Sequence, residues 1–251
     1  MSFTFNRHIA DQNHLLASLP KEVFERIAPH FKVVAVQAGQ DLHASEDESP
    51  VIYFPMTAIL SSYYIMENGA SAEIVGVGNE GMLGVTFFMG GIDKSRLVTV
   101  HTTGLCCRVK GWEMMQEFKL CGAFMHMVIR YAQAFISQVS QSTGCNRQHS
   151  VEQRLCRLLL TSSDRLSSNE LNMTQKLIAG MLGVRREGVT KAAGDLHRSG
   201  IIDYQRGHIT LIDRPGLESH VCECYNVVRK ELHHLLSDES KHADLSSLIP
   251  G

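Results

Sequence analysis

Long apolar runs, a secretory leader and paired cysteine motifs are all missing from this sequence of 251 residues. No run of about eighteen apolar residues occurs, so we predict no membrane span. The first residues lack the apolar core of a signal peptide. The seven cysteines are an odd number without a CxxC pair. These absences favour a reduced, cytoplasmic setting in which the thiols are buried structural groups.

Signatures of catalysis and of metal binding are also absent. The chain has no GxSxG, HExxH, Walker or paired-carboxylate motif, so we do not expect an enzyme. Its thirteen histidines show no ligand spacing, and we expect neither a metal site nor a bound cofactor. Cys222 and Cys224, two positions apart on a predicted helix, would point about 200° apart and make a poor chelate.

The sequence does contain enough apolar residues, 44% of the chain, for two modest cores. Its net charge of −2 is unevenly spread. Residues 1–119 hold nine Lys and Arg against thirteen Asp and Glu, whereas residues 173–214 hold seven against four. The basic C-terminal region suits local contact with nucleic acid.

Short alternating apolar segments separated by glycine turns dominate residues 31–110. The predicted strands are 33–36, 51–54, 59–66, 73–77, 97–101 and 105–109. The Asn68-Gly69 pair between two of them is a strong hairpin signal. Many short strands at regular spacing favour an antiparallel barrel or jelly roll. One helix over residues 15–30, ending at Pro29, is expected to precede it.

From about residue 114 to 144 the apolar period becomes helical. Two stripes run side by side, the first formed by Met125, Ile129, Ala132, Ile136 and Val139 and the second by Phe124, Val128, Tyr131 and Phe135. Spacing of four and three is what two helices need to pack together. Two stripes imply two partners, the barrel and a second subunit, with the first stripe as the dimer interface. The alternative is one helix buried on both sides within a monomer.

Residues 145–149 break this pattern and are interpreted as a hinge. Ser150 then begins a new helix, and Gln153 completes a capping box. One further helix is expected near the C-terminus, with the apolar stripe Leu217, Val221, Tyr225, Val228, Leu232 and Leu235. Residues 237–251 are polar and predicted to be a flexible tail.

Between these helices, two short amphipathic helices flank a turn at Gly183, with Thr174 as the N-cap of the first. At about 100° per residue, the second helix separates two arcs. The polar arc holds Arg186, Glu187, Thr190 and Lys191, and the apolar arc holds Val189, Ala192, Ala193 and Leu196. This pattern predicts a helix-turn-helix whose second helix enters the DNA major groove. The alternative is a plain helix pair in which Glu187 and Lys191 form an ordinary ion pair.

A β-hairpin, or wing, is predicted after the second helix, with strands 201–204 and 208–211 around the turn 205–207. Arg206 and His208 at its tip, with Thr174 and Gln175, are expected to contact phosphates. Arg185 stands where a Ser or Thr cap is usual. A cation there opposes the positive end of the helix, and an arriving phosphate would relieve that cost.

Arg186-Glu187-x-Val189-x-Lys191, the preceding Thr174 and the wing resemble the winged helix of bacterial Crp/Fnr-family transcription regulators. The resemblance implies that Arg186, Glu187 and Lys191 contact base edges. The family usually has Arg where this chain has Lys191, so the bidentate guanidinium is lost there.

The resemblance implies an α+β chain with four regions. An antiparallel, jelly-roll-like β-roll of the cyclic-nucleotide-binding-like type would form a sensor domain over residues 1–113. A dimerisation helix with its hinge would follow at 114–149, and a winged helix-turn-helix domain with a C-terminal helix at 150–236, before the tail. The implied partners are double-stranded DNA with an inverted-repeat site, a second copy of the chain and RNA polymerase.

The effector residues of the family are largely replaced. Its cyclic-nucleotide binders hold the ribose with a Glu that follows a Gly, and the phosphate with an Arg-Ser pair. Gly84 matches the Gly, but Val85 replaces the Glu, and Ser95 and Arg96 stand where Arg-Ser is expected. Val85 cannot accept a hydrogen bond from the ribose hydroxyl. Arg96 is displaced by one residue, so it is expected to face the other side of a strand. Ser140 falls where a base contact would come. We therefore expect a remodelled or empty pocket and little or no binding of cAMP.

Iron–sulfur sensing in the family uses an N-terminal cysteine cluster, but here no Cys precedes Cys106, so no Fe–S cluster is expected. Three classes of function compete. The first is a dimeric DNA-binding regulator, the second is a ligand or redox sensor whose helix-turn-helix serves only for docking, and the weakest is an enzyme. Salt-dependent binding to duplex DNA would separate the first from the second.

Overall fold

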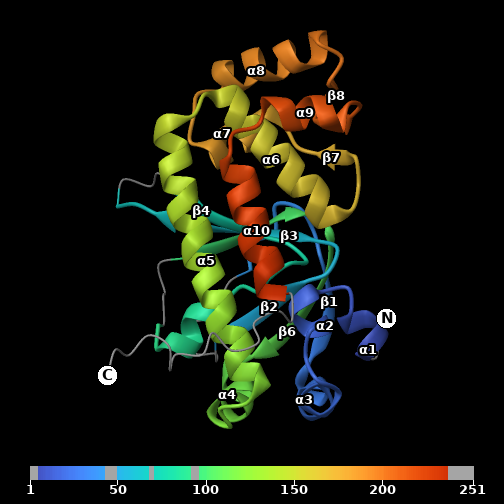
Figure 1. The fold of residues 1–251 in the computed structure, drawn as a ribbon, viewed down its shortest axis with the longest axis vertical. Helices are drawn as coiled ribbons and strands as arrows, with labels where there is room; N and C mark the ends of the chain where they lie inside the picture. The colour runs from blue at the N-terminus through green and yellow to red at the C-terminus, as the bar shows by residue number, and fades with distance from the viewer. Residues whose placement is uncertain (1–4, 43–49, 68–70, 92–95, 237–251) are drawn as a thin grey trace, which may run out of the picture.

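The computed structural model describes residues 5–42, 50–67, 71–91 and 96–236. Figure 1 shows a strand-rich N-terminal part and a helical C-terminal lobe, with one long helix running along both. Among the described helices, none is long and apolar enough to cross a lipid bilayer.

Six strands of the described residues build the N-terminal part, which we call the roll. They are β1 (Lys32–Val36), β2 (Val51–Pro55), β3 (Ile59–Ile65), β4 (Ser71–Val77), β5 (Arg96–Thr102) and β6 (Gly104–Lys110). They pair antiparallel in two three-stranded sheets, β1-β6-β2 and β4-β3-β5. Each lies within two residues of a predicted strand, because alternation of apolar and polar residues is a local signal. The Asn68-Gly69 turn lies outside the described residues.

The interior of the roll is formed by the inward positions of these strands. Leu60 of β3 pairs with Val77 of β4 and Val100 of β5, and all three are at most 1% exposed. Ile52 and Phe54 of β2 are fully buried beside them. Burying side chains of this size stabilises a fold by about 1.5–3 kcal/mol each.

The N-terminal helices differ from the prediction. The chain forms α1 (Arg7–Ala10), α2 (His14–Ala17), α3 (Lys21–Ile27) and the 3-10 turn η1 (Ala28–His30), instead of one helix over 15–30. That expectation was wrong because Pro20 has no N–H to continue a helix from α2, and it serves as the N-cap of α3.

Asn13 fastens this helical segment to the roll. Its side-chain amide is fully buried and donates to the carbonyls of Pro55, at 2.8 Å, and Gly81, at 2.9 Å. Its side-chain oxygen caps α2 by accepting from the N–H groups of Leu15 and Leu16. One side chain therefore satisfies four backbone groups from three segments.

Two helices replace the single helix expected over 114–144. They are α4 (Gly111–Lys119) and α5 (Ala123–Gln148), separated at Cys121, whose φ of 54° is left-handed. The predicted hinge at 145–149 was also too long. Helix α5 continues to Gln148, and the backbone becomes extended at its C-cap, His149. Polar residues at 146–148 end the apolar stripe, but they do not interrupt the backbone hydrogen bonds of the helix.

The two stripes of α5 have different surroundings. Members of the second stripe, Phe124, Val128, Tyr131 and Phe135, are all buried in the core of the roll. In the first stripe, Ala132 is buried and Met125 and Val139 are half-buried, whereas Ile129 and Ile136 are 53% and 52% exposed. Helix α10 (Cys224–Leu236) packs along α5 (Figure 1).

The C-terminal lobe begins with α6 (Val151–Leu166), and Ser150 and Gln153 form the predicted capping box. It continues with β7 (Glu170–Asn172), α7 (Gln175–Leu182), α8 (Arg186–Arg198), β8 (Ile202–Gln205), β9 (His208–Leu211) and α9 (Arg214–His220). Strand β7 was not predicted, and it pairs with β9 in a sheet of order β7-β9-β8. The single C-terminal helix was also wrong, because Val221 has extended backbone and α10 starts only at Cys224.

We predict that Asn13→Ala lowers the free energy of unfolding by roughly 2–4 kcal/mol, because it leaves two buried carbonyls without donors and removes the cap of α2. Thermal or urea unfolding measures the loss. The matched control is Asn6→Ala, which removes an exposed cap with one hydrogen bond to Ile9 and should cost about 1 kcal/mol or less. Equal losses for the two variants would show that Asn13 acts only as a cap.

Candidate nucleic-acid interface

Helices α7 and α8 pack against each other around a tight turn. Gly183 ends α7 with a left-handed φ of 61°, and the hydroxyl of Thr174 accepts from the N–H of Leu177 at 3.2 Å to begin it. The apolar arc of α8 faces the lobe, and its members Val189, Ala192, Ala193 and Leu196 are at most 5% exposed. Figure 1 shows α8 at the end of the molecule farthest from the roll.

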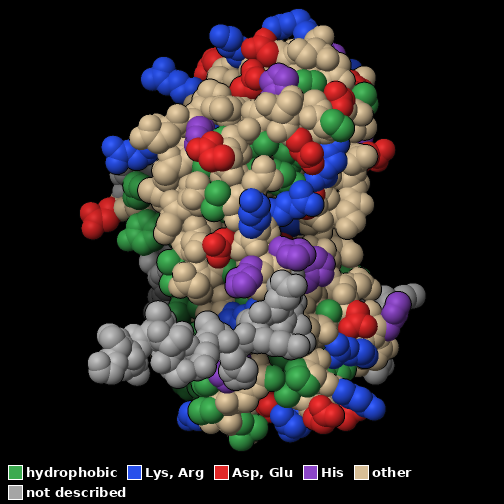
Figure 2. Space-filling model, in the orientation of Figure 1, with side chains coloured by type: hydrophobic (Ala, Val, Ile, Leu, Met, Phe, Trp, Pro, Cys, Tyr) green, Lys and Arg blue, Asp and Glu red, His purple; other side chains and the backbone are tan. Residues whose placement is uncertain are grey.

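The opposite face of α8 is polar and open to solvent. Arg185, Arg186, Glu187, Thr190 and Lys191 are all exposed. Figure 2 shows Lys and Arg side chains standing out at this end of the molecule, with acidic side chains between them. Although the alternative assumed an ion pair between Glu187 and Lys191, these two described residues do not pair with each other.

Gln175 links the two helices on this face. Its side-chain oxygen accepts from the Thr190 hydroxyl at 2.8 Å and from Nε of Arg186 at 3.4 Å. The structure therefore brings together three predicted site residues, Gln175, Arg186 and Thr190.

The first amides of α8 are left without a side-chain cap. Arg185 occupies the N-cap position with extended backbone, and its side chain makes no capping hydrogen bond. An anion at this end would accept those N–H groups and would meet the Arg185 charge as well. The geometry is that of an anion-binding helix end.

The wing is folded as a hairpin with two left-handed residues, Arg206 (φ 48°) and Gly207 (φ 88°), at its turn. The carbonyl of Gly207 accepts from the N–H of Met173 at 2.8 Å, which ties the wing to the start of α7. Thr174 and Arg206 consequently line one cavity of about 400 Å³, shared with residues of the roll. His208 lies apart from it, with Nδ1 3.0 Å from the side-chain oxygen of Asn172.

The effector residues inferred from the family are dispersed. Gly84 has a left-handed φ of 102° and precedes the 3-10 helix η2 (Val85–Met89), which places Val85 in the core of the roll at 1% exposure. Arg96 pairs with Tyr64 at the start of β5, and Ser140 is exposed on α5. Ser95 lies outside the described residues. Gly84, Val85 and Ser140 line neither the 400 Å³ cavity nor the cavity described next.

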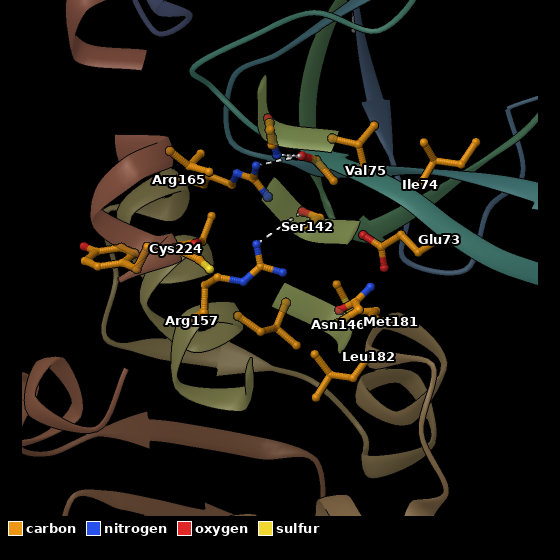
Figure 3. Close-up of a pocket in the computed structure, with 16 residues that line it drawn as sticks. Glu73, Ile74, Val75, Ser142, Asn146, Arg157, Arg165, Met181, Leu182 and Cys224 are labelled. Carbon is orange, nitrogen blue, oxygen red and sulfur yellow. Dashed lines mark hydrogen bonds between the residues drawn. The ribbon is translucent and has the colours of Figure 1, made fainter. Parts of the chain in front are cut away.

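A second cavity of about 90 Å³ lies between the roll and the lobe. Figure 3 shows Arg157 and Arg165 of α6 entering it opposite β4, with Ser142 of α5 between them. Arg165 is 8% exposed; its Nε donates to Glu80 at 2.8 Å, and its Nη2 donates to the carbonyl of Gly76 at 2.6 Å. Arg157 donates to the Ser142 hydroxyl at 3.2 Å.

Two titratable groups of the roll are strongly affected by this arrangement. Burial raises the pKa of Glu73 to about 7, although the charge of Arg165 and a hydrogen bond from Ser61 act in the opposite direction. Its Oε2 is buried without a hydrogen-bond partner. Burial and the charge of Arg165 lower the pKa of His101 to about 4. His101 is therefore neutral at pH 7, whereas Glu73 changes its protonation state at a much higher pH than an exposed carboxyl does.

The sequence prediction missed a cluster of ligand-type side chains. Cys145 and His149 at the end of α5 meet Cys222 and Cys224, and the ligand atoms of all four lie within 4.8 Å of one another. The expectation of no metal site is thus not confirmed. Cys222 and Cys224 do not share a helix, so their predicted 200° divergence does not apply. The i,i+4 spacing of Cys145 and His149 was the available signal. Six cysteines are buried as expected, but the expectation was wrong for Cys121, which is exposed because it lies in the break between α4 and α5.

The family model of the Crp-like helix-turn-helix domain matches residues 153–220, which include the turn, α8 and the wing. No curated protein matches the chain significantly. The C-terminal lobe is therefore a Crp-like helix-turn-helix domain.

Solved structures extend the likeness to the roll. FixK2 of Bradyrhizobium japonicum is 15% identical, with a TM-score of 0.65 over 76% of this chain and 98% of that one. TTHB099, a CRP-family transcriptional regulator of Thermus thermophilus, is 18% identical, with a TM-score of 0.62 over 74% and 95%. The c-di-GMP-responsive regulator CLP of Xanthomonas campestris is 13% identical, with a TM-score of 0.61 over 76% and 99%. The chain has the Crp/Fnr-type transcription-regulator fold.

We predict that Glu73→Gln stabilises the protein at pH 8 by about 1–3 kcal/mol and has little effect near pH 4.5. Burial raises the pKa of the Glu73 carboxyl in the folded protein to about 7. The contribution of this carboxyl to the free energy of unfolding is therefore fully present below its pKa in the unfolded chain, and it is lost as the pH rises through 7. Thermal unfolding at both pH values measures the difference. The exposed control Glu170→Gln should show no such pH dependence. If Glu73→Gln changed the melting temperature equally at both pH values, the raised pKa of Glu73 would be contradicted.

Proposed function

We propose that this chain, with its Crp-like helix-turn-helix domain and Crp/Fnr-type fold, is a homodimeric transcription regulator that binds specific DNA sequences. The observation that carries the proposal is the exposed polar face of α8 above an apolar face packed in the lobe. A helix placed in this way can enter the major groove without unfolding any part of the chain.

The polar face of α8 divides into base-contacting and phosphate-contacting groups. Arg186 has a planar guanidinium that matches two acceptors of guanine, and Glu187 can accept from the amino group of cytosine. Lys191 adds a single point charge and therefore less selectivity than an Arg would. The uncapped helix start at Arg185 suits a phosphate. Thr174, Gln175, Arg206 and His208 are assigned to phosphates, and Thr190 holds Gln175 in place.

The dimer contact is assigned to α5. Ile129 and Ile136 are seven residues apart, lie on one face of α5 and are each more than half exposed. Large apolar side chains exposed in a row on one helix are typical of an interface. The half-buried Met125 and Val139 and the buried Ala132 would support this contact at its border. Two copies of α5 would set two α8 helices about 34 Å apart, as an inverted-repeat site requires.

The roll is assigned a role as a sensor that does not use cAMP. Val85 has no polar atom to accept a ribose hydroxyl, and its side chain is in the core. Activation or repression by such a dimer would act through RNA polymerase, the partner that a transcription regulator must ultimately influence.

We predict that Arg186→Ala weakens binding to the specific site by about 1–3 kcal/mol and relaxes the preference at one base pair in each half-site. Site selection from random duplexes, followed by titration of the selected and scrambled sites, measures both effects. The control Arg206→Ala removes a phosphate contact, so it should weaken all sequences alike and flatten the salt dependence. An unchanged selected motif for Arg186→Ala would remove Arg186 from the base-contacting set.

We predict that Ile136→Glu converts the dimer to a monomer at low micromolar concentration, because it buries an unpaired carboxylate in the contact. Sedimentation velocity measures the assembly state. Gln148→Glu places the same charge at an exposed position of the same helix and should leave the dimer intact. A dimeric Ile136→Glu variant would rule out this face of α5 as the contact.

A further inference from the structure

Four ligand-type side chains from distant parts of the sequence meet where α5 ends and α10 begins. Cys145 lies in the last turn of α5, and His149 is the C-cap of the same helix. Cys222 lies in the connection after α9, and Cys224 is the first residue of α10. All three thiols are buried, and they form a small cluster separate from the two main cores.

Two of the distances between these ligand atoms are those of a tetrahedral metal site, and all four atoms lie within 4.8 Å of one another. With zinc–sulfur bonds of about 2.3 Å and zinc–nitrogen bonds of about 2.0 Å, tetrahedral ligands lie about 3.8 Å apart for two sulfurs and about 3.5 Å apart for sulfur and nitrogen. The Sγ atoms of Cys145 and Cys222 are 3.6 Å apart. Sγ of Cys224 and Nδ1 of His149 are 3.5 Å apart. From this agreement we infer that Cys145, His149, Cys222 and Cys224 form a structural zinc site.

The surroundings of His149 fit this role. Its Nδ1 faces the thiols, while its Nε2 lies 3.3 Å from a carboxylate oxygen of Glu223. Histidine ligands commonly donate the N–H of their second nitrogen to such a carboxylate, which fixes the ring and the protonated nitrogen. Gln141 donates to Sγ of Cys224 at 3.0 Å, as expected for a sulfur that carries negative charge.

The charge around the site is also complementary. Arg154 is 6% exposed, forms no ion pair with any described carboxylate, and keeps Nε without a hydrogen-bond partner. Burial lowers the pKa of Arg154, and negative charge on Cys145 and Cys222 would raise it. Zinc with three thiolates and a neutral histidine carries a net charge of −1, and the three thiol protons pass to solvent as the sulfur–zinc bonds form. The complex thus supplies the anion that Arg154 lacks.

Zinc fits better than the alternatives. A disulfide between Cys145 and Cys222 would need their sulfurs at about 2.05 Å and would leave Cys224 and His149 unused. Three sulfurs and one nitrogen in tetrahedral positions favour zinc over hard cations such as Mg²⁺ and Ca²⁺, which take oxygen ligands. Four protein ligands close the coordination shell, which is the mark of a structural site.

The site would join α10 to the end of α5, next to the start of α6 at Ser150. It would therefore fix the connection between the long helix and the Crp-like domain. This inference concerns metal binding and folding alone, and it stands independently of any DNA sequence that the protein recognises.

The first experiment measures metal in the full-length protein, expressed with zinc in the medium and then exchanged into metal-free buffer. Elemental analysis should give one zinc per chain. Replacement by Co²⁺ should produce the thiolate-to-cobalt charge-transfer band and the visible bands of tetrahedral cobalt. Cys145→Ser and Cys222→Ser should abolish stoichiometric zinc and the charge-transfer signature. The controls Cys156→Ala, for a buried thiol outside the site, and Cys121→Ser, for an exposed one, should retain both.

The second experiment uses a variant of an exposed residue, so that any loss of zinc affinity cannot come from disturbed packing of the core. Glu223 is exposed, so Glu223→Gln should fold normally and weaken zinc affinity by about 10- to 100-fold in competition with a chromophoric chelator. A chelator should also lower the melting temperature of the native chain but not that of Cys145→Ser. Folded native protein without zinc, or with a Cys145–Cys222 disulfide under non-reducing mass spectrometry, would overturn the inference.

Discussion

The position of the Crp-like domain on the roll depends on one buried guanidinium. Arg165 leaves α6, crosses to the roll and donates to both Glu80 and the carbonyl of Gly76. The contact needs glycine at Gly78, because a Cβ there would come within 2.7 Å of the Arg165 side chain. A buried pair of this kind adds little net stability, but losing one partner costs about 3–5 kcal/mol, so it selects one arrangement against others.

The same guanidinium couples the charge state of the roll to the lobe. Its field lowers the pKa of both Glu73 and His101, although burial moves the two groups in opposite directions. A ligand or a shift of β4 that moves Gly76 would therefore act on Arg165 directly. Helix α6 begins at the Ser150 cap beside the cysteine cluster and carries Arg165 to the roll, so it connects the cluster with the Arg165 contact.

Local signals accounted for most of what the sequence predicted. The strands follow from alternation, the start of α6 from the Ser150 capping box, and the turn between α7 and α8 from Gly183. The residues of the exposed α8 face were identified because the spacing of polar and apolar residues within one helix can be recognised from the sequence alone. The helix breaks at Cys121 and Val221 were missed, since an apolar stripe continues equally well across two packed helices. The cysteine cluster joins residues up to 79 positions apart, which only the tertiary fold brings together.

Helix α10 packs along α5, and Ile129 and Ile136 are the large apolar side chains that the described part of α5 leaves exposed for a partner. In the proposed dimer, the fraction of chains that are paired depends on the concentration of the protein. Below the dissociation constant of the pair, dimer abundance grows with the square of chain abundance. Occupancy of a two-part DNA site would then respond more steeply to synthesis and turnover of the protein than simple saturation allows.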